Sequence, residues 1–335
     1  MSIAEQPDSK RKRAESPDHS SAVVEVARSD IWYDDGNVIL QAQGTQFRVH
    51  KSLLAQSSSV FNDMFSFPQP PATDAGLVEG CPVVHLSDSA AEVRYILQAI
   101  FQREHTAGEN MPLPVLSAFL RLGSKYDIQK LNIQARKKLF QNFPSTLAAD
   151  DALDTHFHGI EKPTEEPYVE LLLIARSAGL LSILPRVLYE CCETCPASQI
   201  RKDGFNINGS TVQLSLSEQV TLLAGQIAMR DALAATTYQW FDQDVATASC
   251  ATPGPCQTIR KNTYLEILTS TSAGGLDDWS WPETMLIGEF CQHCAAVAPT
   301  KHAAGRERFW EQLPDFFDLP SWDELLKERE GILEI

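Results

Sequence analysis

The sequence predicts an α+β domain near the N-terminus, in which a helical cluster covers a small sheet, followed by a mainly α-helical domain. Apolar residues alternate with a period of two between Asn37 and Val49, which is the pattern of a half-buried β-hairpin. Apolar residues recur at helical spacing in the segments that follow. The length of 335 residues favours two folded units, since a domain has roughly 150 residues.

The composition is that of a folded, acidic protein. Hydrophobic residues make up 43% of the chain, and 44 acidic against 28 basic residues give a formal charge of -16. Nucleic acid is therefore an unfavourable partner for the folded part, because phosphate binding needs clustered Lys and Arg. The most apolar later stretch, Val169 to Leu184, contains Glu170 and Arg176, and it is too short and too charged to span a bilayer. We expect no membrane association.

Residues 1–28 are predicted to form a disordered tail, because they lack aromatic residues and are rich in Ser, Pro and charged residues. No apolar stretch between Met1 and Ser21 could serve as a secretory signal, so we expect the chain in the nucleus, the cytoplasm or both, with its eight cysteines kept as thiols. Within the tail, a basic tetrad before Ser16-Pro17 resembles a short nuclear-import signal: Lys10, Arg11, Lys12 and Arg13. A solvated charge run explains the tetrad equally well.

The first elements of the N-terminal domain follow from apolar spacing. Val38, Leu40 and Ala42 share one face of a strand, Gln43-Gly44 supplies a turn, and Phe47 and Val49 alternate on the return. Apolar residues at helical spacing then predict two short helices, with Ser57 to Ser59 as candidate N-caps between them. These apolar residues are Leu53, Leu54, Val60, Phe61, Met64 and Phe65.

A short strand over Val83 to Leu86 and further helices complete this domain. Ser89 and Glu92 have the spacing of a capping box, in which each side chain satisfies a free amide of the other residue. The helix that they start carries a full apolar stripe: Val93, Ile96, Leu97, Ile100 and Phe101. Two more helices are predicted, one around Leu116, Phe119 and Leu120 and one around Ile128, Leu131, Ala135 and Leu139. This order of elements alone indicates an α+β domain.

The residues themselves resemble the signature of the BTB/POZ domain over residues 29–143. An aspartate precedes the first strand in Asp30-Ile31-Trp32, a His-Lys pair begins the first helix, and Ser-x-x-Phe-x-x-Met-Phe closes the second. The positions that match are Asp30, His50, Leu54, Ser58, Phe61, Met64 and Phe65. The sequence of the loop from Phe67 to Pro71 is similar to that of BTB proteins abundant in mushroom-forming fungi.

The resemblance implies a scaffold that binds other proteins and commonly a second copy of itself, without catalysis. Many members of this family are adaptors for cullin-based ubiquitin ligases, and others are transcriptional cofactors. Two features bear on these roles. The segment Ala22 to Val26 is either a swapped dimerisation strand or a short tail element. The hydrophobic-x-Glu motif of a cullin adaptor is missing where the third helix leaves as Phe101-Gln102-Arg103-Glu104.

Residues 144–335 are predicted to be mainly helical. A linker or insertion over Asp150 to Pro167 precedes a helix pair that ends near Cys195. Ser215 and Glu218 form a second capping box, and the helix from there to about Phe241 carries a broad apolar face of Val220, Leu223, Ile227 and Tyr238. Near the end, aromatic residues either dock into the core or form a partner-binding patch, and Ser321 caps a final helix that stops near Gly331. These aromatic residues are Phe309, Trp310, Phe316 and Phe317.

Cysteine spacing gives the sharpest chemical signal. Cys250-x5-Cys256 precedes Cys291-x2-Cys294, and these four thiolates could close a tetrahedral structural zinc site. The same cysteines could instead be small buried hydrophobes. Cys191, Cys192 and Cys195 supply a further Cys-x2-Cys.

A cysteine-dependent enzyme is the remaining class of protein to consider, and it would need a histidine beside the thiol. No histidine stands in a recognisable catalytic context, including His156, His158 and His302, and His50 is interpreted as a structural residue at a helix start. The sequence therefore predicts a non-enzymatic adaptor or scaffold, with a nuclear transcriptional co-regulator as the alternative.

Overall fold

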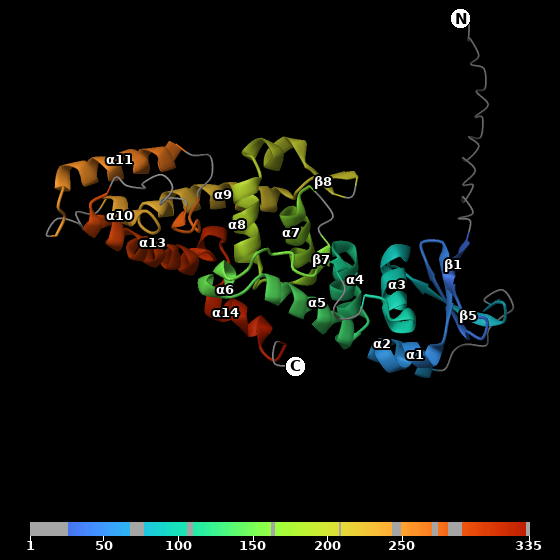
Figure 1. Ribbon diagram of the computed structural model, residues 1–335. Helices are drawn as coiled ribbons and strands as arrows, with labels where there is room; N and C mark the ends of the chain where they lie inside the picture. Colours follow the sequence, from blue (N-terminus) through green and yellow to red (C-terminus); the bar gives the residue numbers. More distant parts are fainter. Residues whose placement is uncertain are drawn as a thin grey trace, which may run out of the picture.

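The computed structural model describes residues 26–67, 77–105, 110–161, 165–207, 209–242, 249–269, 274–280 and 290–332. The molecule is elongated, with the sheet at one end and the helices Gln239–Asp242 and Pro253–Thr269 at the other (Figure 1). Its largest sheet has five strands in the order β1-β3-β2-β5-β4. The strands are β1 (Ala27–Trp32), β2 (Val38–Ala42), β3 (Thr45–Val49), β4 (Leu77–Val78) and β5 (Cys81–Leu86).

The predicted hairpin is confirmed by the pairing of β2 with β3. Val38 lies opposite Val49 and Leu40 opposite Phe47, so the apolar residues of both strands share one face. Gln43 and Gly44 have φ values of 43° and 79°, which the two-residue turn of a tight hairpin requires. The turn thereby sets the register that buries this face.

Strand β1 corrects the predicted limit of the tail. The strand begins at Ala27 and pairs in parallel with β3, whereas the tail was expected to extend to residue 28. Residues 1–25, which include the basic tetrad and most of the segment from Ala22 to Val26, lie outside the described residues. Val26, the last residue of that segment, is described and is 46% exposed.

Helices cover one side of the sheet (Figure 1). They are α1 (Lys51–Ser57), α2 (Ser59–Ser66), α3 (Ala90–Leu97), α4 (Leu113–Lys125) and α5 (Gln129–Asn142). Phe47 of the sheet and Leu54, Phe61 and Leu97 of the helices are almost fully buried in one core. The stripe predicted after Ser89 is buried at Val93, Ile96 and Leu97, and it continues with Ile100 and Phe101, which pack against the core half-buried in a π-helical turn over Gln98–Gln102.

The C-terminal region is mainly helical, as predicted, and it shares a continuous core with the first domain. Its helices are α6 (Leu147–Asp151), α7 (Pro167–Ala178), α8 (Leu184–Thr194), α9 (Leu216–Leu233), α10 (Gln239–Asp242), α11 (Pro253–Thr269), α13 (Gln292–Gln312) and α14 (Trp322–Leu326), with single turns at Gln199–Asp203, Asp315–Phe317 and Lys327–Arg329. Two small sheets pair β6 (Met111–Pro112) with β7 (Ile160–Glu161) and β8 (Phe205–Ile207) with β9 (Ser210–Val212). Helix α4 also packs against α7, so the two parts are in direct contact.

The segment predicted as a linker, Asp150 to Pro167, is partly structured. It contains the end of α6 and strand β7, and Asp150 is buried beside Arg186 of α8. The pairing of β7 with β6, just before α4, fastens this segment to the first domain.

The apolar face predicted for the helix after Ser215 is wrong at two of its four positions, since Tyr238 is buried and Leu223 packs against the core. The capping box of Ser215 and Glu218 is present, but Val220 and Ile227 are 58% and 65% exposed. Instead α9 buries a stripe of Leu222, Gly225, Met229 and Leu233. Gly225 permits this packing, because a Cβ atom at position 225 would lie only 2.3 Å from the Phe317 ring. Helix α9 also ends at Leu233, well before Phe241.

The C-terminal aromatic residues dock into the core, which was one of the two predicted outcomes. Phe309, Trp310 and Phe317 are at most 4% exposed. The Trp310 ring stacks on Trp322 with a centroid distance of 5.4 Å. The final helix begins after Ser321, as expected, but the side chain of Ser321 makes no capping hydrogen bond.

Candidate functional site

The signature residues of the first domain hold the sheet against its helices. Ser58 caps α2, since its hydroxyl accepts a hydrogen bond from the backbone N–H of Phe61 at 3.0 Å and donates one to the carbonyl of Tyr126. The Phe61 ring stacks on Tyr126 with a centroid distance of 4.8 Å. Asp30 pairs with Arg94 of α3, and the Ser29 hydroxyl and Arg94 lower the pKa of this carboxyl. Leu54 is fully buried, whereas Met64 and Phe65 are half-buried.

A buried carboxylate links the segment after β5 to the C-terminal end of α4. Asp88 accepts hydrogen bonds from the ammonium group of Lys125 at 2.8 Å and from the hydroxyl of Tyr126 at 2.5 Å. Burial raises the pKa of Asp88, but these hydrogen bonds outweigh it, and the net pKa is below its usual value. Burial and the same carboxylate raise the pKa of Tyr126. The sequence pattern missed this network, because nothing in the spacing of Asp88 and Tyr126 shows that they meet.

His50 has the structural position that the sequence predicts. It stands at the N-cap of α1 without a side-chain cap, and its Nε2 atom lies 3.3 Å from a carboxylate oxygen of Asp35. Its ring lies 5.6 Å from that of Tyr33 and 6.5 Å from that of Phe101.

One groove lies on the helical side of this domain. It is bounded by Gln56–Ser59 at the junction of α1 and α2, by Arg103–His105 after the π-helical turn, and by Asp127–Leu131 at the start of α5. Ile100 lends it an apolar side chain, and its rim is polar and carries both signs of charge. The backbone of Arg103 is in the left-handed region with φ 57°, and the helix ends there. This is the segment in which a cullin adaptor would carry its hydrophobic-x-Glu motif.

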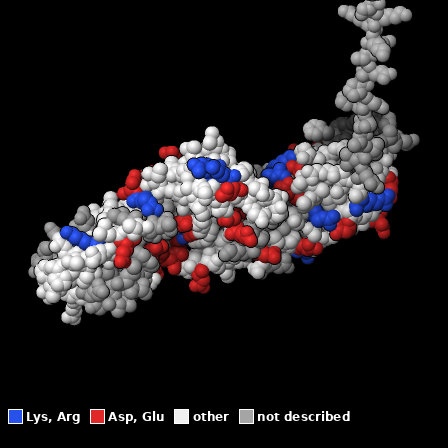
Figure 2. Space-filling model, turned by 90° about the horizontal axis from the view of Figure 1, so that it is seen from above, with Lys and Arg blue, Asp and Glu red and all other residues white. Residues whose placement is uncertain are grey.

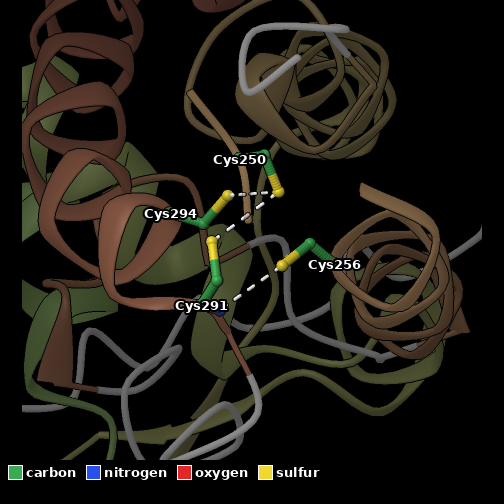
Figure 3. Close-up of side chains that lie close together, drawn as sticks. All are labelled: Cys250, Cys256, Cys291 and Cys294. Carbon is green, nitrogen blue, oxygen red and sulfur yellow. Dashed lines mark hydrogen bonds between the residues drawn. The ribbon is translucent and has the colours of Figure 1, made fainter. Parts of the chain in front are cut away.

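The four cysteines predicted as metal ligands come together in the structure. Their sulfur atoms all lie within 4.8 Å of one another (Figure 3). Cys250 Sγ is 3.6 Å from Cys291 Sγ and 3.5 Å from Cys294 Sγ, and the backbone N–H of Cys291 donates to Cys256 Sγ at 3.4 Å. The backbone N–H of Cys294 lowers the pKa of the Cys291 thiol to about 5, whereas burial raises the pKa of Cys294.

The other cysteine group differs from this cluster. Cys191, Cys192 and Cys195 are all buried in or just after α8, and the Cys192 thiol donates to the carbonyl of Leu222 at 3.4 Å. Among the described residues, no thiol is hydrogen-bonded to a histidine. His156 instead bonds to Asp150 and Tyr168, and His302 bonds to the carbonyl of Asp277.

Basic and acidic side chains are interspersed over the described residues of the face shown in Figure 2. Within the described part of the chain, no helix combines the length and the apolar character needed to cross a bilayer. The basic tetrad from Lys10 to Arg13 lies outside the described residues.

The first folded unit is thus an α+β domain with a groove on its helical side. Residues 34–142 match the family model of the BTB/POZ domain, and the chain therefore contains a BTB/POZ domain. This family consists of protein-interaction modules rather than enzymes. No curated protein matches the chain.

Proposed function

We propose that this chain is a protein-interaction adaptor, in which the BTB/POZ domain binds one protein or a second copy of itself and the C-terminal helices present a surface to another. The match of residues 34–142 to the BTB/POZ family carries the proposal. The continuous core from the sheet to α13 supports it, since a partner held at one end is then rigidly related to a partner held at the other.

The groove beside α5 is the proposed surface for the first partner. Its rim offers Arg103 and Lys130 as cations and Glu104 and Asp127 as carboxylates, around apolar atoms of Ile100. An apolar centre with a polar rim is the usual composition of a transient protein interface. Recruitment to a cullin-based ubiquitin ligase would use this side of the domain.

Binding to a purified cullin tests the ligase role directly. We expect the full chain to retain the cullin on affinity resin, and the variant Arg103→Glu/Lys130→Glu to bind at least about tenfold more weakly. The matched control Arg201→Glu/Lys261→Glu makes the same change of charge at exposed positions outside the BTB/POZ domain. Capture of cullin no greater than by bare resin would remove the ligase role but not the adaptor proposal.

Self-association is proposed through the open edge of the sheet. Strand β1 is paired only with β3 among the described strands, so its other side offers backbone groups to the segment Ala22 to Val26 of a second chain. Light scattering after gel filtration should show a dimer for the full chain and a monomer after removal of residues 1–26. A monomer at every concentration tested would contradict self-association.

A nuclear co-regulator is the second candidate, and the basic tetrad favours it. A fluorescent fusion should lose nuclear accumulation when Lys10 to Arg13 are replaced by alanine, and keep it when Asp18 to Ser21 are replaced instead. The same distribution for both variants would argue against a nuclear role that depends on the tetrad.

A further inference from the structure

The four-cysteine cluster is built from the N-terminal ends of two helices. Cys250 precedes α11 and Cys256 lies in its first turn, while Cys291 is the N-cap of α13 and Cys294 lies in its first turn. The two pairs therefore approach from separate helices (Figure 3). Any bond that joins them would fix α11 to α13.

The spacing of the sulfur atoms fits a single tetrahedral ion. With a zinc–sulfur bond of about 2.3 Å, four sulfurs at the corners of a tetrahedron are about 3.8 Å apart. The distances of 3.5 and 3.6 Å from Cys250, and the limit of 4.8 Å for all pairs, bracket that value. The cluster therefore has the size of a mononuclear zinc–thiolate site before any rearrangement.

Other uses of four neighbouring cysteines fit less well. A disulfide needs a sulfur–sulfur distance of about 2.05 Å, and all four thiols are free in the structure. An iron–sulfur cluster binds its cysteines to several iron atoms and separates them more widely than this group. Simple packing would bury all four thiols, as it does Cys191, Cys192 and Cys195, yet Cys250 and Cys291 are only half-buried.

The surroundings of the cluster suit negatively charged sulfur. Helix N-termini carry partial positive charge, and both α11 and α13 begin here. The backbone N–H of Cys291 donates to Cys256 Sγ, and the Thr252 hydroxyl lies 3.3 Å from the same atom. Such hydrogen bonds orient and stabilise metal-bound thiolates. Lys301 and Arg260 line the hollow beside Cys294 and add positive charge.

Helix α11 docks through a narrow face, with Ile259 and Tyr264 packed against the core at its margins. Its fully buried residues are Cys256, Arg260, Thr263 and Ile267, which follow one face at helical spacing. Only the last of these is a large aliphatic residue, although a helix of 17 residues normally docks through a broad apolar stripe. A metal bond at the N-terminal end of α11 would add to this limited apolar contact.

We propose that Cys250, Cys256, Cys291 and Cys294 bind one Zn²⁺ ion with tetrahedral geometry, and that this ion fastens α11 to the N-terminal end of α13. All four positions of the metal are filled by thiolate, so the site is structural rather than catalytic. The proposal is independent of the partner that the BTB/POZ domain binds.

Metal analysis of the full chain, purified without chelator from zinc-supplemented cells, tests the site. We expect about one equivalent of zinc per chain, and a mercurial reagent should release it as about four thiols react. Cys250→Ser/Cys294→Ser should lower the zinc content at least about tenfold, whereas Cys81→Ser should leave it unchanged. Cys81 is a suitable control because its buried thiol bonds to the carbonyl of Gly36 in the other domain.

Hydrogen exchange of the unaltered chain tests the fastening and does not require any variant to fold. Removal of zinc by a strong chelator should speed amide exchange in α11 by about tenfold or more, while exchange in α4 and α5 stays the same. Less than about a tenth of an equivalent of zinc, or one equivalent of iron in its place, would overturn the metal assignment. Unchanged exchange in α11 after zinc is lost would overturn the structural role.

Discussion

Replacing Arg186 tests how the helices that follow the BTB/POZ domain are held to one another. Asp150 of α6 and Arg186 of α8 are each 8% exposed, and Arg186 Nε donates to Asp150 Oδ2 at 2.9 Å. A second guanidinium nitrogen donates to Glu190 at 2.5 Å, and His156 Nε2 lies 3.0 Å from Asp150 Oδ1. Arg186→Met would keep most of the side-chain volume and leave two carboxylates without their cation.

The free energy of unfolding should fall by about 3 kcal/mol. Loss of one partner from a buried ion pair costs about 3–5 kcal/mol, and the lower value applies because the Glu190 side chain is 17% exposed and can regain water. Asp150→Asn in the same chain removes the uncompensated buried charge, and we expect it to recover about 1–3 kcal/mol. The pair of Arg94 and Asp30 is the matched control, since side-chain exposures of 34% and 68% predict a loss of only about 0.2–1 kcal/mol for Arg94→Met.

Urea unfolding at neutral pH, followed by circular dichroism, measures these differences. Hydrogen exchange of the amides in α6 and α8 gives a local measure, which is needed because a chain with two domains need not unfold in one step. A loss below about 1 kcal/mol for Arg186→Met, or a double variant as unstable as the sum of the two single variants, would refute the reasoning.

Three further predictions concern the two domains separately. The pKa of Asp88 in the folded chain is lower than in the unfolded chain, so the stability that its carboxylate contributes is present above about pH 4 and is lost as the pH falls below that value. Thermal unfolding between neutral pH and about pH 2 should therefore show a smaller loss of stability in acid for Asp88→Asn than for the wild type. Ser58→Ala should lower the free energy of unfolding in urea by about 1–2 kcal/mol, because it removes the cap of α2 and the hydrogen bond to the Tyr126 carbonyl. The control Ser66→Ala removes only an exposed hydrogen bond and should lower it by less than about 0.5 kcal/mol. Gly225→Ala should destabilise the chain by about 1 kcal/mol or more, because the new Cβ would meet the buried Phe317 ring, although alanine favours helices. Phe317→Leu in the same chain should restore part of the stability that is measured by thermal unfolding.

The elements of the BTB/POZ domain could be predicted from the sequence because their signals are local. The strand period around Leu40, the Gln43-Gly44 turn and the serine caps act within a few residues, and the structure places the hairpin and the helix starts where they indicate. The groove and the buried carboxylate of Asp88 depend on residues more than 30 positions apart, such as Asp88 and Tyr126. Their meeting is set by packing, which apolar spacing does not report.

The cysteine cluster lies between these cases. The spacing of the four cysteines predicted one shared metal site, and the structure brings Cys250 and Cys256, near the start of α11, to Cys291 and Cys294, at the start of α13. The looser spacing of the first pair is accommodated because Cys250 lies before α11 and Cys256 lies within it. Sequence spacing alone could not show this.

Helix α9 shows where apolar spacing misleads. Val220, Leu223, Ile227 and Tyr238 were predicted to form one core face, but Val220 and Ile227 are 58% and 65% exposed. The buried face is chosen by Phe317, which needs the space over Gly225 on the neighbouring side of the helix. A pattern of apolar residues does not record where a distant ring will pack.

Charged substitutions on α9 test this assignment of its faces. Val220→Glu and Ile227→Glu should each change the free energy of unfolding by less than about 0.5 kcal/mol, because both side chains already face water. Leu222→Ala, on the buried face two residues after Val220, should cost about 2–5 kcal/mol, since Leu222 is fully buried. Urea unfolding of the three variants decides between the faces. If the two glutamate variants unfolded most easily and Leu222→Ala resembled the wild type, the face predicted from spacing would be the buried one after all.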